Sequence, residues 1–335
     1  MVRGRIGPKI LVGIAMVVSL AVFAGCSAMM SSKPIMPVKE YEKLIVGRLD
    51  ADYVGDQACL SKCHEHDQYK KYFDASTMGA QLSPESGLPL VNCESCHGPG
   101  SLAIAGIKTV NGKPTCDFST FIDLKELPKE AQSLICLKCH TANATFNLHN
   151  WNAGTHNLSG VSCFDCHNVH QGADLKVHPK DVANLCYGCH PYIKAEFALP
   201  THHAVPEGRI SCLDCHDPHG SPNEKQLKES TTKELCTNCH AEKEGPFAFE
   251  HADVTDDCRN CHVPHGSANN NLLTARVPYL CLQCHMHHSI GQEVGGGNSN
   301  TTIAKPRFFT NCTDCHSQIH GTDLPGNHVP GSLIR

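Results

Sequence analysis

The chain has 335 residues, of which 22 are cysteine and 24 are histidine, and a chain of this length does not need so many cysteines for disulfide pairing. Aromatic residues make up only 6%, and 20 prolines with 27 glycines interrupt regular elements, so we do not expect a conventional large apolar core. The formal net charge is −5 and there is no basic patch or stripe, which excludes nucleic acid as an expected partner.

Residues 1–25 have the pattern of a signal peptide. Arg3, Arg5 and Lys9 form a positive segment ahead of an apolar run that extends from residue 10 to residue 23. This run is shorter than the roughly 20 residues that a membrane-spanning helix needs. The segment therefore predicts export and removal of the leader.

The end of the apolar run, Phe23-Ala24-Gly25-Cys26, resembles the lipobox of bacterial lipoproteins and predicts lipidation of Cys26. Ordinary cleavage after Ala28 is the alternative. Ser27 stands where an aspartate would retain a lipoprotein at the inner membrane, so the resemblance implies the outer membrane. Removal of residues 1–25 takes away three positive charges and changes the formal charge from −5 to −8. Residues 26–50 carry no motif, and we expect a tether followed by a short helix.

Residues 51–335 contain ten cysteine motifs, which we number one to ten along the chain. Nine read C-x-x-C-H, and motif one reads C-x-x-x-C-H. Two thiols add to the vinyl groups of one haem, and the adjacent histidine becomes the proximal ligand of its iron. The predicted cofactor is therefore haem c, ten copies in all, bound covalently. The attachment cysteines are Cys59, Cys63, Cys93, Cys96, Cys136, Cys139, Cys163, Cys166, Cys186, Cys189, Cys212, Cys215, Cys236, Cys239, Cys258, Cys261, Cys281, Cys284, Cys312 and Cys315, and the proximal histidines are His64, His97, His140, His167, His190, His216, His240, His262, His285 and His316.

Two other uses of paired cysteines are disfavoured. Zinc ribbons also contain C-x-x-C units, but here a histidine follows every cysteine pair. A thioredoxin-like redox motif would need a βαβ pattern around it, and none is present. Export agrees with haem, because c-type haems are attached outside the cytoplasm.

The spacing of the motifs predicts the fold class, a multihaem cytochrome c. From His140 to His285 the proximal histidines are 22 to 27 residues apart, which leaves room for a short helix and a loop in each repeat. We expect short helices and loops wrapped around a linear stack of haems, with little or no sheet. Residues 127–136 and the capping box Thr231-Thr232-Lys233-Glu234 predict two of these helices. Residues 51–145 form a divergent part with a spare Cys116, expected to be a thiol in a loop or a cross-link to another protein, and residues 146–335 contain the regular repeats.

Fourteen histidines remain for the opposite face of each iron. Imidazole on both faces gives a low-spin iron suited to electron transfer, so the surplus favours a conductor over a catalyst. Four candidates, which we call trailing histidines, follow a proximal histidine by three or four residues: His170, His219, His265 and His320. Three candidates, which we call leading histidines, precede a motif by seven to nine residues: His156, His203 and His251. For all of these, the alternative is a surface histidine.

Two neighbouring pairs leave the choice of ligand open. After motif nine, His287 and His288 are adjacent, and we expect one of them, preferably His288, to bind iron. The same ambiguity applies to His202 beside His203, where His203 is the predicted ligand.

Several longer segments are more specific than the motifs alone. WNAGTH at 151–156, CESCHGPG at 93–100 and NCTDCHSQIHG at 311–321 resemble the MtrA/DmsE family of periplasmic decahaem cytochromes, a similarity that covers about residues 55–325. The resemblance implies a chain of bis-histidine haems inside an outer-membrane β-barrel porin, lipid-anchored on the periplasmic side. It also implies periplasmic donor cytochromes at the N-terminal haem, and a surface multihaem cytochrome or terminal reductase at the C-terminal haem.

The N-terminal third departs from the family pattern. Family members usually have a distal histidine where this chain reads Ser76-Thr77-Met78-Gly79, and another where it reads Gly100-Ser101-Leu102-Ala103. One hypothesis makes Met78 the sixth ligand of an early haem, which would raise its potential. In the other, Met78 only fills space, and one of four remaining histidines takes its place: His66, His149, His178 or His328.

The favoured function is extracellular electron transfer by conduction across the outer membrane, without enzymatic activity. A periplasmic shuttle without a porin is the first alternative. The second is a reductase that uses an open N-terminal haem, although the chain lacks the C-x-x-C-K motif of one nitrite reductase family.

Overall fold

The computed structural model describes residues 44–62, 68–76, 78–140, 148–170, 179–251, 257–285, 311–325 and 333. The predicted signal peptide and Cys26 lie outside these residues. Contacts divide the chain into two compact units, the first with residues 1–63 and 93–127 and the second with residues 64–92 and 128–335. The predicted change of character near residue 145 stays a prediction.

The first unit is built around the helix of motif two. The buried carboxylate of Glu94, within this motif, accepts hydrogen bonds from the backbone N–H groups of Val54 (2.9 Å), Gly55 (2.8 Å) and Gly100 (2.9 Å). Strands β1 and β2 form an antiparallel hairpin, with Lys108 opposite Thr115. The elements are α3 (Asp56–Lys62), α5 (Cys93–His97), α6 (Ser101–Ala105), β1 (Lys108–Val110), β2 (Lys113–Thr115) and the 3-10 helix η1 (Phe118–Thr120).

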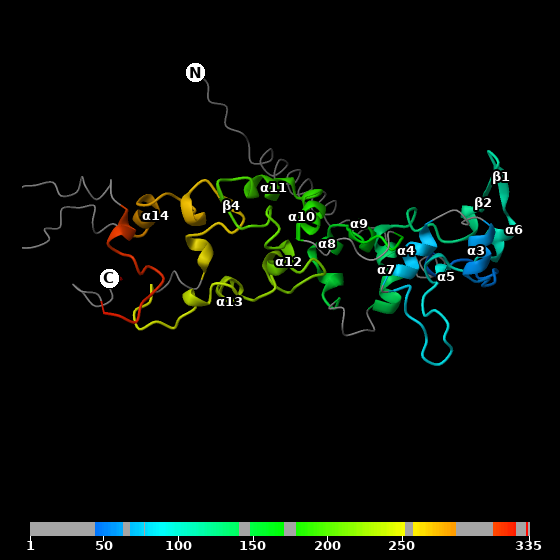
Figure 1. Cartoon of the computed structure of the whole chain (residues 1–335), viewed down its shortest axis with the longest axis horizontal. Coiled ribbons are helices and arrows are strands. Elements are labelled where there is room, and N and C mark those ends of the chain that lie inside the picture. Colours follow the sequence, from blue (N-terminus) through cyan, green and yellow to red (C-terminus); the bar gives the residue numbers. More distant parts are fainter. Residues whose placement is uncertain are drawn as a thin grey trace, which may run out of the picture. The chain divides into compact units, whose positions relative to one another are not determined.

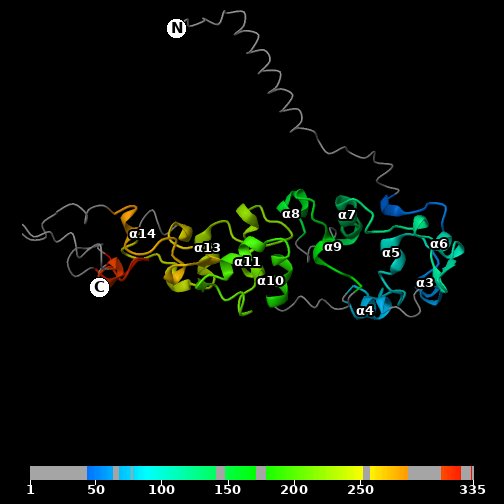
Figure 2. The same cartoon turned by 90° about the horizontal axis from the view of Figure 1, so that it is seen from above.

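The second unit consists of short helices joined by loops, as Figures 1 and 2 show. Helices α7 and α9 lie side by side, and so do α10 and α11. Its helices and strands are α4 (Tyr69–Ala75), α7 (Lys129–His140), η3 (Trp151–Ala153), α8 (Thr155–Leu158), α9 (Cys163–Cys166), α10 (Pro179–Tyr187), α11 (Pro191–Phe197), β3 (Thr201–His202), α12 (Cys212–Cys215), η4 (Glu224–Gln226), α13 (Thr232–Thr237), η5 (Ala241–Lys243), η6 (Cys258–Asn260), β4 (Gly266–Ser267), η7 (Asn270–Leu272), α14 (Tyr279–Leu282) and η8 (Cys312–Asp314).

Capping side chains begin the helices that carry several motifs. Asp165 accepts from the backbone N–H of Ser162 (2.7 Å), and Asp214 accepts from that of Ser211 (2.8 Å). The capping box predicted at Thr231 is confirmed, since Thr231 and Glu234 exchange reciprocal hydrogen bonds of 3.1 Å. The predicted helix that enters motif three is also confirmed, as α7. Each cap fixes the start of the turn that presents the next cysteine pair.

Sheet is confined to two short ladders within the described residues, β1 with β2 and β3 with β4. The expected fold class, a multihaem cytochrome with short helices and little sheet, is confirmed. In the part of the chain that the structure describes, no helix is both long and apolar enough to cross a membrane.

The apolar core of the second unit is small. Ala183, Phe197 and Val205 form a buried cluster, and the partly buried Tyr187 and Ile193 pack against it. Phe197 is 6% exposed, whereas Tyr192 on the same helix α11 is 74% exposed. The two faces of α11 therefore contribute very differently to stability.

We expect Phe197→Ala to lower the free energy of unfolding by about 3–5 kcal/mol, because it leaves a cavity in the cluster. Tyr192→Ala, an aromatic truncation on the exposed face of α11, should change it by less than about 0.5 kcal/mol. Denaturant titration of both haem-loaded variants, followed by circular dichroism, measures the difference. Equal losses would contradict the assignment of the core to this cluster.

Candidate haem centres

One helical turn brings together the attachment groups of each described motif. From motif four to motif ten, the backbone N–H of the proximal histidine donates to the carbonyl of the first cysteine over 2.8–3.0 Å. Motif two forms helix α5, and motif three ends helix α7. This turn places both thiols and the imidazole within reach of one macrocycle.

Six proximal histidines face a second histidine at nearly constant distance. Their ring centroids are 5.9–6.4 Å apart. The pairs are His167 with His219, His190 with His156, His216 with His265, His240 with His203, His262 with His320, and His285 with His251.

This separation fits an iron held between two imidazoles. Metal–nitrogen bonds of about 2 Å on each side, plus the ring radii, place the centroids roughly 6 Å apart. Direct ring contact covers a similar range of distances. However, every one of the six pairs joins a proximal histidine to a leading or trailing one. The donor set is therefore that of a bis-histidine haem.

The pairing follows a simple order. A leading histidine faces the proximal histidine of the second motif that follows it, as His156 faces His190 of motif five. A trailing histidine faces a proximal histidine two motifs back, as His219, which follows motif six, faces His167 of motif four. Each of these centres thus takes its two ligands from different repeats.

The leading histidines are oriented by hydrogen bonds from Nδ1. Each faces the carbonyl of the residue just before a trailing histidine: His156 faces Pro218 (3.0 Å), His203 faces Pro264 (2.5 Å) and His251 faces Ile319 (3.1 Å). A carbonyl only accepts, so Nδ1 donates and Nε2 is left as the ligand atom. The same contacts join the ligands of two successive centres.

Three proximal histidines are held in the same way. Nδ1 of His216 lies 2.9 Å from the Lys225 carbonyl, and Nδ1 of His262 lies 2.8 Å from the Asn271 carbonyl. Lys225 and Asn271 have φ of +53° and +57°, a region that costs a side-chain-bearing residue about 1–2 kcal/mol. His97 similarly faces the carbonyl of Ile122 at 3.0 Å. The strained turns at 225 and 271 present the acceptors for these imidazoles.

His265 has a charged partner, unlike the leading histidines. Its Nδ1 lies 2.8 Å from Oε2 of Glu196, a carboxylate at the end of helix α11. Burial lowers the pKa of His216 on the opposite side of this centre, and it also lowers the pKa of His320. Both shifts favour the neutral imidazole, which is the form that binds metal.

The first cysteines of the motifs lie together in pairs. Hydrogen bonds join the thiols of Cys59 with Cys93, Cys136 with Cys163, Cys186 with Cys212, Cys236 with Cys258, and Cys281 with Cys312. The bond from Cys136 lowers the pKa of Cys163 to about 7, and the bond from Cys186 does the same for Cys212. Thioethers formed at these pairs would attach the haems of two successive motifs at neighbouring positions.

Two buried hydrogen-bond donors could be satisfied by a bound group that carries oxygen acceptors. Trp151 Nε1 and Tyr187 Oη are buried and have no hydrogen-bond partner in the described part of the chain. Because buried polar groups are normally paired, haem propionates are suitable acceptors for both. The residues present therefore fit the cofactor that the motifs predict.

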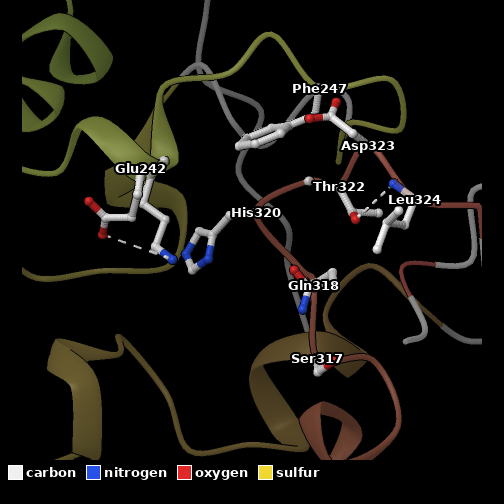
Figure 3. A pocket seen from close by; sticks show the side chains of 10 residues that line it. Glu242, Phe247, Ser317, Gln318, His320, Thr322, Asp323 and Leu324 are labelled. Carbon is white, nitrogen blue, oxygen red and sulfur yellow. Dashed lines mark hydrogen bonds and ion pairs between the residues drawn. The ribbon is translucent and has the colours of Figure 1, made fainter.

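A cavity of about 300 Å³ adjoins His320. Lys243 and Glu242 from η5, together with Phe247, Gln318 and Thr322, are among the residues that line it. Figure 3 shows the ring of His320 pointing toward Glu242. This open space lies at the distal ligand of the centre that also contains His262.

The structure distinguishes the two members of one ambiguous pair. His203 faces His240, whereas His202 contacts the Leu199 carbonyl through Nδ1 (2.7 Å) and Glu207 through Nε2 (3.2 Å). His149 is exposed in a turn ahead of η3. Several candidates lie outside the described residues: Cys63, His64, His66, His178, His287, His288 and His328.

Cys116 is not the thiol in a loop that the sequence predicted. It is disulfide-bonded. Motif spacing gives no signal for the pairing of a cysteine that lies outside the motifs. Sequence reasoning also missed Glu196, because nothing local to an ordinary helical glutamate links it to His265.

Comparison with known proteins gives two matches. The family described as the doubled CXXCH motif matches residues 156–195, 202–245 and 251–289. The chain is also 34% identical over 285 residues to the protein named multiheme cytochrome MtrA of Shewanella baltica (strain OS185), which covers 84% of this chain and 81% of that protein. Each doubled segment begins at or next to a leading histidine and contains two motifs, so its leading histidine faces the second motif of the same segment.

We expect His203→Ala to convert one low-spin haem to a high-spin haem, because the iron beside His240 loses its second imidazole. His202→Ala is the matched control and should leave all haems low-spin. Electron paramagnetic resonance of the oxidised variants, normalised to haem content, measures the change. Identical spectra for the two variants would contradict the pairing of His203 with His240.

We expect Glu196→Gln to raise the potential of the haem between His216 and His265, because the carboxylate makes His265 a stronger donor to ferric iron. A tenfold change in a one-electron equilibrium corresponds to about 59 mV, and the shift should be of that order. Glu207→Gln, which alters the partner of the non-ligand His202, is the control. Potentiometric titration in which neither or both variants shift would contradict the tuning role of Glu196.

Proposed function

Because the chain belongs to the MtrA family of multihaem c-type cytochromes, we propose that it conducts electrons from the periplasm across the outer membrane. Its family membership confirms the resemblance that the motifs predicted, and it establishes haem c binding and electron transfer. We further propose that all ten motifs carry haem, and that the chain works inside a β-barrel porin.

The interlocked histidine pairs support conduction most strongly. In six centres a second imidazole stands opposite the proximal one, which leaves no position on the iron for a substrate. Bound haem supplies a one-electron ferric–ferrous couple. In five of these pairs a backbone carbonyl orients one of the two imidazoles, which favours coordination that stays the same in both oxidation states.

The order of the centres supports a directional path. Leading and trailing ligands connect each described centre only to repeats nearby in sequence, so the centres of the second unit follow one another along the chain. Such a path is useful when its two ends face different donors and acceptors. We place periplasmic donor cytochromes at the N-terminal haem, and a surface multihaem cytochrome or a terminal reductase with extracellular acceptors at the C-terminal haem.

The proposed location follows from the leader and from the charge. A lipid on Cys26 would tether the chain to the periplasmic side of the outer membrane, and the acidic mature chain would enter a porin of complementary lining. A periplasmic shuttle would bind the same haems but would not assemble with a β-barrel protein. A reductase would need a haem with an open face.

We expect a β-barrel protein to co-purify with the chain expressed in its native host. Vesicles that contain both proteins should pass electrons from external dithionite to an enclosed redox dye, and vesicles with the barrel alone should not. Reduction of the enclosed dye requires an electron path through the barrel, because dithionite does not cross the bilayer during the assay. Dye absorbance measures the transfer.

Other outcomes would favour the alternatives. A chain that purifies alone and reduces soluble acceptors, without transfer into vesicles, would be a shuttle. One stoichiometric high-spin haem that binds nitrite in the purified protein would support the reductase.

A further inference from the structure

Each doubled segment contains the ligand for its own second motif. His156, His203 and His251 stand at the start of the three matched segments and face the proximal histidines of motifs five, seven and nine. Motifs two and three form the double that precedes these segments. If this double follows the same order, a residue ahead of motif two faces His140, the proximal histidine of motif three.

Met78 occupies the corresponding position in sequence. It lies fifteen positions before Cys93, and this interval contains an eight-residue hairpin, Leu82–Pro89, closed by a β-bridge between its ends. The N–H of Ser83 donates to the Leu88 carbonyl inside it (2.8 Å). Without the hairpin the interval is seven residues, the same as that from His156 to Cys163.

The packing ahead of Met78 matches that ahead of a leading histidine. Ahead of His203, helix α11 places the ring of Phe197 5.3 Å from the trailing His265. Ahead of Met78, helix α4 places the ring of Tyr69 4.9 Å from the trailing His170. An aromatic side chain thus covers the trailing imidazole in both places, and the chain then continues to the leading position.

The backbone at Met78 is held in a fixed turn. Ser76 Oγ donates to the Phe73 carbonyl (2.5 Å) and accepts from the N–H of Gly79 (3.0 Å). A Cβ at residue 79 would lie 2.1 Å from the Phe73 oxygen, so only glycine fits there. Met78 is partly buried in this turn. The turn therefore fixes the backbone position from which the Met78 side chain extends.

We propose that Sδ of Met78 is the sixth ligand of the iron attached through motif three, opposite His140. The assignment rests on the proposed haem loading, and it identifies one centre as different from the histidine pairs. A thioether is a weaker donor to ferric iron than imidazole, so this centre has a higher potential than its neighbours. A thioether also has no N–H, so Met78 makes no contact with the Val169 carbonyl of the kind that the leading histidines make with residues 218, 264 and 319.

The test is near-infrared magnetic circular dichroism of the oxidised protein. The wild type should show the thioether-to-iron charge-transfer band at the intensity of one haem. Met78→Leu, which keeps the volume but removes the sulfur, should abolish the band. Met78→His should replace it with a bis-histidine signal and lower the highest midpoint potential in the titration.

Met286→Leu is the matched control, because Met78 and Met286 are the two methionines beyond residue 50. It should leave the band intact. A wild type without the band, or a band that survives in Met78→Leu, would overturn the proposal. The haem count by mass spectrometry and the vesicle assay report separately on haem loading and conduction, so failure of those proposals is recognised independently of Met78.

Discussion

The opposition of two imidazoles from different repeats is the constraint on which this structure depends. Among the residues that the structure describes, few apolar side chains are buried, and the cluster around Phe197 is small. A haem held by two thiols and a proximal histidine of one repeat, and by a leading or trailing histidine of another, would replace that missing core. The hydrogen bonds at Pro218, Pro264 and Ile319 then make successive centres dependent on each other.

The same constraint serves conduction. With haem bound, a second imidazole would close each of the six described centres to substrates and would keep the ligands unchanged as the iron gains and loses an electron. Paired first cysteines bring the attachment edges of successive macrocycles together. Glu196 at His265 and the thioether proposed at motif three alter single centres without altering this arrangement. The same contacts would therefore determine both the fold and the path of the electrons.

Much of the site was predictable because haem attachment uses a local motif. The cysteines, proximal histidines and ligand candidates could be read from spacing, and the Thr231 capping box is likewise local. The spacing favoured His203 but left His202 open, because the contact that orients His203 is made with a carbonyl 61 residues away at Pro264. The role of Glu196, 69 residues from its partner, was hidden for the same reason.

The order of the ligands also limits how such a chain changes length during evolution. A trailing histidine belongs to a motif two positions back, so deletion of one motif would place imidazoles opposite the wrong irons throughout the neighbourhood. Duplication of a whole doubled segment, from one leading histidine to the next, keeps every ligand in register. We therefore expect natural relatives of different length to differ by pairs of haems, with the irregular ligands retained at the two ends where no further segment supplies a partner.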